Sequence, residues 1–193
     1  MRTLIYTAFV SLDGVVDSPG GGSPTEAHRS GGWTYRDIEF RPEAYELKGR
    51  ETTEAAALMF GRTSYQAFAP VWPDLADFAA LKDLPKYVVS TTLDPAALVH
   101  NWGEITILRS LDDVAALKET DGGPIVVHGS ATLARNLSDA GLIDRYHLLV
   151  FPLLLGAGKR MFSDTDRDKQ LLRVVESETY ANGIVKLVYD VVR

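Results

Sequence analysis

Short apolar runs alternate along the chain with more polar segments in which leucines recur at helical spacing. The apolar, β-branched runs are typical of strands buried on both faces of a sheet, and they cover residues 3–10, 58–60, 86–91, 105–108, 124–127 and 146–155. Helical patterns cover residues 33–57, 74–83, 111–118 and 131–140, and another helix is expected to begin at residue 63 or 64. This alternation predicts an α/β fold with a mainly parallel sheet and helices on both faces.

The chain closes with two β-rich runs, 172–180 and 184–192, on either side of Asn182-Gly183. Asn-Gly is the strongest short-range hairpin signal, so we expect an antiparallel hairpin at the edge of the sheet. Ser110 and Ser130 are the expected N-caps of the helices that follow them, and Gly141 is expected to end the second of these helices. With no internal repeat and no domain boundary, the sequence predicts a single domain over residues 1–193.

Composition narrows the class of function. With a net charge of −6, the chain is not expected to bind a nucleic-acid backbone. The absence of cysteine excludes disulfides and thiolate zinc sites, and His28, His100, His128 and His147 lack the spacing of metal ligands. There is no signal-peptide pattern, and no apolar run approaches the roughly 20 residues of a spanning helix. We therefore expect a cytoplasmic protein with no metal, membrane or nucleic-acid partner.

Four turns with polar or glycine residues come directly after predicted strands. They are marked by Asp13, Arg62, Ser90 and Gly129. The carboxyl ends of parallel strands meet at one edge of a sheet, where open α/β proteins bind their ligands. Ser130 and the helix that follows it would present free backbone N–H groups, which suit a phosphate. The sequence thus predicts a dinucleotide site at this edge.

Two common enzyme motifs are absent, and two glycine-rich segments each allow two interpretations. There is no Gly-x-Ser-x-Gly motif of a hydrolase, and no Gly-x-Gly-x-x-Gly motif follows the first strand. The run Gly156-Ala157-Gly158-Lys159-Arg160 fits a phosphate-binding loop or a loop with solvated cations. Residues 18–32, rich in Gly, Pro and Ser, must form a loop. It is interpreted as a lid over the active site or as a mobile surface loop.

The segment 128–162, HGSATLARNLSDAGLIDRYHLLVFPLLLGAGKRMF, resembles the C-terminal half of the dihydrofolate-reductase-like superfamily, above all the branch shared with the reductase domain of bacterial riboflavin biosynthesis. The stretch from Ser11 to Gly14 and the Gly61-Arg62 segment fit the same superfamily. The resemblance implies a three-layer dihydrofolate-reductase-like fold with NADPH as cofactor. It implies that the cofactor is bound by Ala8, Ser11, Gly14, Gly61, Arg62, Thr63, Ser64, Ser90, Thr91, His128, Gly129, Ser130, Ala131 and Thr132.

The implied function is NADPH-dependent reduction of a small pyrimidine-like or pterin-like heterocycle. Asp13 is the candidate catalytic residue, either orienting the substrate or helping to deliver a proton. Thr7 stands where the resembling riboflavin reductases have a lysine, which bears on whether their phosphorylated substrate is used. A pterin-binding acid would fall near Tyr45, but Glu43 and Glu46 are interpreted as solvated, so folate reduction is not supported.

Two alternatives stay open. One is the riboflavin-pathway reductase itself, which acts on 5-amino-6-(5-phosphoribosylamino)uracil. The other is a catalytically silent nucleotide-binding or sensor protein on the same fold. An NADPH assay against pteridines and aminopyrimidines would separate these possibilities.

The sequence also bears on which cofactor is preferred and on whether the chain forms a dimer. An acid just after a strand is typical of NAD sites and an arginine of NADP sites. Arg62 supplies the arginine and no acid follows until Asp74, so NADPH is expected over NADH. The resemblance implies a homodimer. The apolar strand 148–155 and the closing hairpin, more apolar than a solvent-facing edge should be, favour the same conclusion.

Overall fold

Strands and helices alternate along most of the chain, as the apolar pattern predicts. The computed structural model describes residues 1–21, 28–164 and 169–193. The strands are β1 (Leu4–Ser11), β2 (Ala57–Gly61), β3 (Lys86–Val89), β4 (Ile105–Leu108), β5 (Ile125–Val127), β6 (Arg145–Phe151), β7 (Leu172–Thr179) and β8 (Val185–Val191). The helices are α1 (Trp33–Arg36), α2 (Glu46–Glu54), α3 (Arg62–Phe68), α4 (Leu111–Lys118) and α5 (Ala131–Asp139), with 3₁₀ helices η1 (Pro42–Tyr45), η2 (Trp72–Asp74), η3 (Ala76–Leu81) and η4 (Pro95–Ala97).

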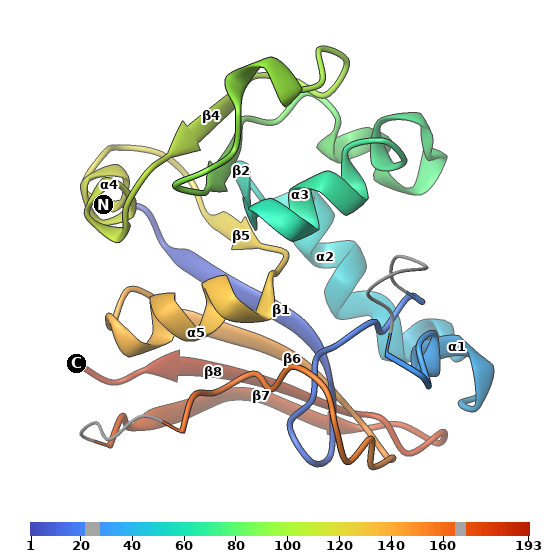
Figure 1. Ribbon diagram of the computed structural model, residues 1–193. Helices are drawn as coiled ribbons and strands as arrows, with labels where there is room; N and C mark the ends of the chain where they lie inside the picture. The colour runs from blue at the N-terminus through green and yellow to red at the C-terminus, as the bar shows by residue number, and fades with distance from the viewer. Residues whose placement is uncertain (22–27, 165–168) are drawn as a thin grey trace.

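The strands of the described residues form one eight-stranded sheet in the order β4-β3-β2-β5-β1-β6-β8-β7. The six strands from β4 to β6 run parallel, and β8 and β7 continue the sheet antiparallel. β5 is inserted between β2 and β1, so that β1 lies inside the sheet (Figure 1). The predicted parallel sheet with a closing antiparallel hairpin is confirmed.

Helices cover both faces of this sheet (Figure 1). Alternate residues of β1 from Leu4 to Val10 pack in one cluster with Leu133 and Leu137 of α5. On the opposite face, a second cluster joins α1 and α2 to β6 and β8, and a third joins α3 to β2 and β3. The three-layer arrangement predicted from the sequence is therefore confirmed.

The predicted helix ends are confirmed for α4 and α5. Ser110 forms a capping box at the start of α4, and the Ser130 side chain accepts the N–H of Leu133 at the start of α5. Gly141 follows α5 with a φ of +67°, a conformation that glycine adopts at little cost. The next N–H, of Leu142, donates to the carbonyl of Leu137 over 2.9 Å and closes the helix end.

Several element expectations are wrong. Residues 74–83 form no α-helix; η2 and η3 occupy this region as 3₁₀ turns. The N-cap of α3 is Gly61, so Thr63 and Ser64 lie inside its first turn and do not cap it. The region 33–57 is divided because Pro42 opens a separate 3₁₀ helix.

The expectation that residues 148–155 form an exposed apolar edge is also wrong. β6 is paired with β1 on one side and with β8 on the other. Its apolar residues are therefore explained by burial within the sheet. The edge strand on this side is β7, which pairs with β8.

The glycine-rich segment 18–32 begins and ends at the same place. The N–H of Gly32 donates to the carbonyl of Ser18 and the N–H of His28 to the Ser18 hydroxyl, each over 2.9 Å. Residues 22–27, the centre of the predicted lid, lie outside the described residues. Among the helices of the described residues, none combines the length and apolarity needed to cross a membrane.

Candidate functional site

The four turns singled out in the sequence lie at one edge of the sheet. They follow β1, β5, β2 and β3, which are neighbouring parallel strands. The predicted convergence at the carboxyl ends of the strands is confirmed, and this edge is where α/β proteins of this class hold ligands. The roles of the individual residues at this edge stay predictions.

The turns after β2 and β5 are in direct contact. The N–H of Gly61 donates to the carbonyl of Gly129 over 3.0 Å. A Cβ atom on Gly61 would lie 2.5 Å from Ser130 Oγ, and one on Gly129 would lie 2.8 Å from Ser64 Oγ. Both glycines are required for the two backbones to approach this closely, and Gly129 also has a φ of +79°. The starts of α3 and α5 are thereby brought side by side.

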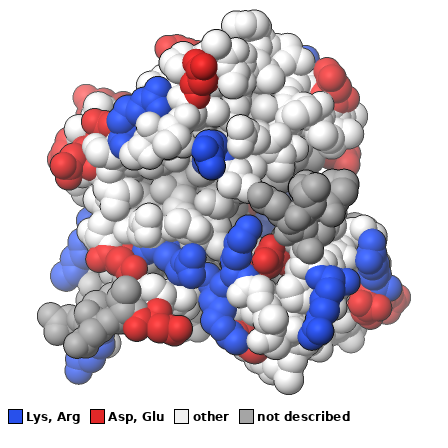
Figure 2. Space-filling view, viewed as in Figure 1, with Lys and Arg blue, Asp and Glu red and all other residues white. Residues whose placement is uncertain are grey.

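This junction lies at a hollow in the surface, and the charged residues around the hollow include several cations (Figure 2). Figure 2 shows a hollow of uncharged surface where the first turns of α3 and α5 meet in the view of Figure 1, with Lys and Arg side chains around it. The N–H groups of Ala131 and Thr132, in the first turn of α5, have no intrahelical acceptor. A hollow with open N–H donors and nearby cations suits an anion even though the net charge is −6.

Two arginines meet at the turn that follows β3. Arg62 Nη1 donates to Thr92 Oγ1 over 2.8 Å. Arg109 Nη1 donates to the carbonyls of Ser90 and Leu93 over 3.1 and 2.9 Å. Each guanidinium has five N–H donors, so both keep donors for a ligand. Sequence reasoning missed Arg109; its place directly after a predicted strand, like that of Arg62, is the signal that could have found it.

The Ser90 side chain is used by its own turn. Its hydroxyl accepts the N–H groups of Thr92 and Leu93 over 3.2 and 3.0 Å. The Ser90 hydroxyl therefore stabilises its own turn. Thr91, the next residue, is exposed. Thr63 and Thr132, in the first turns of α3 and α5, are exposed as well.

Asp13 links the turn after β1 to the loop after β6. Its carboxylate accepts the Ser11 hydroxyl over 2.6 Å and the N–H groups of Leu155 and Gly156 over 3.1 and 2.8 Å. The Ser11 hydrogen bond, with these N–H groups, lowers the pKa of Asp13 to about 2. Asp13 is therefore ionised at neutral pH, which does not suit the predicted delivery of a proton. Orientation of a substrate remains the predicted role.

The glycine-rich loop 156–160 pairs with the same turn. The N–H of Val16 donates to the Lys159 carbonyl and the N–H of Met161 to the Gly14 carbonyl, over 2.9 and 2.8 Å. The Arg160 side chain donates to the carbonyl of Asp13. The loop thus contacts the β1 turn, and the N–H groups of Gly156 and of Leu155, which directly precedes the loop, donate to Asp13.

The remaining predicted cofactor residues have mixed surroundings. Ala8 is buried and packs in the same cluster as α5. Ser11 is buried, and its hydroxyl is used by Asp13 and by the N–H of Val15. The ring of His128 packs 6.2 Å from Phe60 and 5.4 Å from Trp72. Burial lowers the pKa of His128 to about 4, so the ring is neutral at pH 7.

Sequence reasoning missed a buried polar cluster between α2 and the sheet, which we call the Glu51 cluster: Thr7, Lys48, Glu51 and His147. Thr7 Oγ1 donates to the Glu51 carboxylate over 2.7 Å, and His147 Nδ1 lies 2.9 Å from the same group. Lys48 Nζ contacts both Thr7 Oγ1 and, at 3.4 Å, Glu51 Oε1. Glu51 and His147 are each 3% exposed. Three elements, α2, β1 and β6, therefore contribute to one polar cluster inside the protein.

Comparison with known proteins places this chain in a family. The model of the RibD C-terminal domain family matches residues 2–186. The chain belongs to the RibD C-terminal domain family. The uncharacterised protein YyaP of Bacillus subtilis (strain 168) is 29% identical over 139 residues, covering 68% of this chain and 72% of that protein.

Solved structures show the same fold as this family member. A putative riboflavin biosynthesis protein from Shewanella sp. PV-4 aligns over 99% of both chains with a TM-score of 0.75 and 19% identity. Dihydrofolate reductase from Enterococcus faecalis, complexed with NADP(H) and RAB-propyl, aligns over 99% of this chain and 97% of that chain, with a TM-score of 0.58 and 14% identity. Together with the family match, this confirms the predicted branch of the dihydrofolate-reductase-like superfamily.

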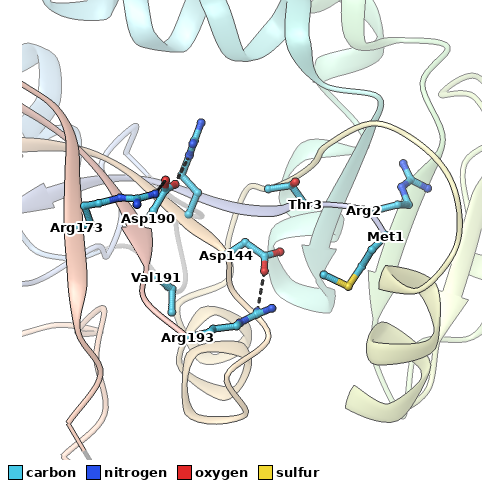
Figure 3. Close-up of a pocket in the computed structure, with 9 residues that line it drawn as sticks. Met1, Arg2, Thr3, Asp144, Arg173, Asp190, Val191 and Arg193 are labelled. Carbon is cyan, nitrogen blue, oxygen red and sulfur yellow. Dashed lines mark hydrogen bonds and ion pairs between the residues drawn. The ribbon is translucent and has the colours of Figure 1, made fainter.

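A pocket at the opposite edge of the sheet is separate from this site. Its volume is about 320 Å³, and it lies where β1 and β6 begin (Figure 3). Asp190 pairs with Arg145 and Arg173 over 2.7 and 3.0 Å, and Asp144 pairs with Arg193 over 2.7 Å. The lining residues are Met1, Arg2, Thr3, Asp144, Arg145, Arg173, Asp190, Val191 and Arg193. Its two carboxylates are engaged by arginines, and it contains none of the predicted site residues.

Proposed function

We propose that the chain is an NADPH-dependent reductase that transfers a hydride to a small pyrimidine-like or pterin-like heterocycle. The carrying observation is the convergence of the β2, β3 and β5 turns into a concave site with open N–H donors and two guanidinium groups, in a member of the RibD C-terminal domain family. The complex of the Enterococcus dihydrofolate reductase with NADP(H) supports this choice of cofactor.

The residues at the strand ends fit NADPH. The pyrophosphate would lie at the first turn of α5, where the N–H groups of Ala131 and Thr132 are open and the helix dipole favours an anion. Arg62 and Arg109 would hold the 2′-phosphate through their remaining guanidinium donors. When bound, the nicotinamide supplies the hydride, and the protein supplies binding and orientation.

Asp13 would act on the geometry of the site. Its carboxylate fixes the turn after β1 against Leu155 and Gly156. This turn borders the strand end where Ser11 and Gly14 are predicted to contact the cofactor. We propose that Asp13 keeps the turn in place and orients the substrate, since an acid with a pKa of about 2 holds no proton at neutral pH.

The relatives support a substrate class. Membership of the RibD C-terminal domain family and the likeness to the putative riboflavin biosynthesis protein from Shewanella favour a pyrimidine derivative. The riboflavin-pathway reductase acting on 5-amino-6-(5-phosphoribosylamino)uracil is the second candidate function. Thr7, in place of the lysine of the resembling reductases, donates its hydroxyl to Glu51, so this position offers no cation of its own.

The test is cofactor binding followed by turnover. NADPH and NADH would be titrated by fluorescence, and NADPH oxidation would then be followed against dihydropteridines, aminopyrimidines and the phosphoribosylaminouracil. We expect tight NADPH binding and turnover with at least one pyrimidine or pterin. NADPH binding without turnover on any of them would favour the silent nucleotide-binding alternative, and no NADPH binding would overturn the proposal.

We also propose that residues 1–193 form a single domain that pairs as a homodimer in the cytoplasm. The exposed residues Leu172 and Val174 of β7 lie on the sheet face that α5 covers farther in, and Phe162 is exposed as well. In Figure 1 the hairpin of β7 and β8 lies beyond α5, at the outer side of the sheet. Apolar side chains on an edge strand favour burial against a second copy.

A further inference from the structure

The Glu51 cluster buries charge at a place where the fold does not need it. Taking a carboxylate and an ammonium out of water costs several kcal/mol for each ion before their attraction is counted. Apolar side chains at these positions of α2 and β1 would pack the same interface without that cost. Buried charged groups beside a ligand site are therefore candidates for a functional role.

The Lys48 ammonium has one N–H donor more than the acceptors that the described residues give it. The ammonium of Lys48 has three donors. Thr7 Oγ1 and Glu51 Oε1 are the acceptors that the described residues give it, so one donor remains. The Lys48 side chain is 18% exposed, whereas Glu51 is 3% exposed. The cluster therefore reaches the surface through Lys48, and Thr7, Glu51 and His147 lie behind it.

Lys48 lies near two elements that border the candidate site. Its ammonium lies 5.2 Å from the ring centroid of Phe9, a half-buried residue of β1 two positions before Ser11. The charges of Glu51 and Lys48 both act on His128, which directly precedes Gly129 at the end of β5. Lys48 thus lies beside β1 and within electrostatic range of the turn predicted to hold the cofactor.

The charge of the cluster selects the kind of acceptor. The ammonium of Lys48 and the His147 hydrogen bond outweigh burial and lower the pKa of Glu51 to about 2, so Glu51 is ionised at neutral pH. Burial lowers the pKa of the Lys48 ammonium, and the Glu51 carboxylate opposes this shift. With both groups charged, the ion pair is neutral overall. A phosphate dianion approaching Lys48 would meet the nearby carboxylate of Glu51, whereas a neutral carbonyl oxygen takes the free donor without that repulsion.

Resting on the proposed function, we propose that Lys48 binds a ring carbonyl oxygen of the heterocyclic substrate. Glu51 and Thr7 are positioning residues that hold the ammonium in place, and His147 fixes Glu51. A lactam-type ring, such as the pyrimidinedione of the riboflavin-pathway substrate named above, offers such an oxygen. A pyrimidine in which amino groups replace all of the ring carbonyl groups would lack this acceptor.

The experiment compares two pyrimidines that differ in this acceptor. With the NADPH-saturated protein, calorimetry would measure binding of 5,6-diaminouracil, of tetraaminopyrimidine and of inorganic phosphate. We expect the wild type to bind diaminouracil at least about tenfold more tightly than tetraaminopyrimidine. Lys48→Met should lose this discrimination while its NADPH affinity stays within about twofold, and Lys169→Met, at an exposed lysine, should behave like the wild type.

Two further arms keep the test decisive. If Lys48→Met folds poorly, Lys48→Met/Glu51→Gln removes both charges together and should give the same loss of discrimination in a folded protein. Reductive methylation mapped by mass spectrometry should modify Lys48 in the free protein, with the exposed Lys169 as reference. A Lys48 that stays unmodified would be sealed inside the fold, which would overturn the inference whatever the substrate is.

The outcomes separate this inference from the proposed function. Equal discrimination in the wild type and in Lys48→Met would overturn the role of Lys48. A wild type that binds NADPH but neither pyrimidine, or that binds phosphate at Lys48 in preference to diaminouracil, would also overturn it while the reductase proposal stands. A wild type that does not bind NADPH would overturn the proposed function itself.

Discussion

Gly61 at the end of β2 and Ser130 at the start of α5 are in such close contact that a Cβ atom on Gly61 would lie 2.5 Å from Ser130 Oγ. The two residues are far apart in the sequence, and each belongs to a turn predicted to bind the cofactor. Their contact sets how closely the starts of α3 and α5 approach. The shape of the proposed phosphate site therefore depends on the absence of a side chain at Gly61.

Replacing Gly61 by alanine should cost about 1–3 kcal/mol in the free energy of unfolding, as overpacking of a buried contact does. In a Ser130→Gly background the cost should fall sharply, because the colliding hydroxyl is gone and glycine is tolerated at an N-cap. Urea unfolding of the single and double variants measures this coupling. Gly49→Ala is the control, since nothing lies within 4 Å of its new Cβ in α2, and it should stabilise the protein slightly. Additive costs for the two substitutions would show that the contact is not strained by a Cβ.

Asp13 should make the protein sensitive to acid. Its pKa falls from the ordinary 3.8 to about 2 in the folded state, so its hydrogen bonds contribute stability that is full above about pH 4. That contribution is lost as the pH falls toward 2. Asp13→Asn should therefore lose less stability than the wild type between pH 4 and pH 2 in urea unfolding, while Asp77→Asn, at an exposed position, should follow the wild type. Parallel curves for Asp13→Asn and wild type would contradict the engagement of this carboxylate.

Much of the fold could be predicted because its strands are short apolar runs that can be recognised from the local sequence alone. The Asn182-Gly183 turn and the caps at Ser110 and Ser130 depend on neighbours only a few residues away. The common edge of the site followed from parallel pairing alone. Local patterns were therefore sufficient for the layers and for the position of the site.

The Glu51 cluster could not be predicted in the same way. Glu51 lies in the charged segment of α2, and no local feature distinguishes it from Glu46, which is exposed. Its partners Thr7 and His147 are 44 and 96 residues away along the chain. Only the pairing of β1 with β6, which aligns Thr7 with His147, brings these groups together under α2. The expectation that residues 148–155 form a sheet edge is wrong for a related reason. The apolar sequence of a strand does not say which strands pair with it.

The proposed homodimer should be sensitive to a charge on the exposed face of β7. Val174 is 54% exposed on the edge strand, so Val174→Glu would place a charge in the proposed interface. Light scattering at micromolar concentration should give a dimer for the wild type and a monomer for this variant. Arg173→Ala, whose side chain lies on the opposite face beside Asp190, should remain a dimer. A monomeric wild type would remove the homodimer, and a dimeric Val174→Glu would place the interface elsewhere.

Arg62 should determine the preference for NADPH over NADH. Its guanidinium is held by the Thr92 hydroxyl, and among the described residues it makes no ion pair, so its charge is open to a 2′-phosphate. A charge-assisted hydrogen bond to that phosphate contributes about 1.5–3 kcal/mol, or roughly 10- to 150-fold in affinity. Arg62→Ala should weaken NADPH binding by about this factor and leave NADH nearly unchanged, as measured by fluorescence titration of both cofactors.

The control for Arg62→Ala must remove an equal charge far from the site, because net charge alone changes the affinity for any anion. Arg173→Ala does so at the opposite edge of the sheet, beside the pocket of Figure 3, and should change NADPH and NADH affinity little and equally. Arg109→Ala should weaken NADPH binding by an amount between the effects of Arg62→Ala and Arg173→Ala. It should also weaken NADH binding, because Arg109 donates to the carbonyls of Ser90 and Leu93 and its loss would loosen the turn for both cofactors. If Arg62→Ala weakens NADPH and NADH in parallel, Arg62 contacts the pyrophosphate or supports the turn, and the 2′-phosphate must be held by another group.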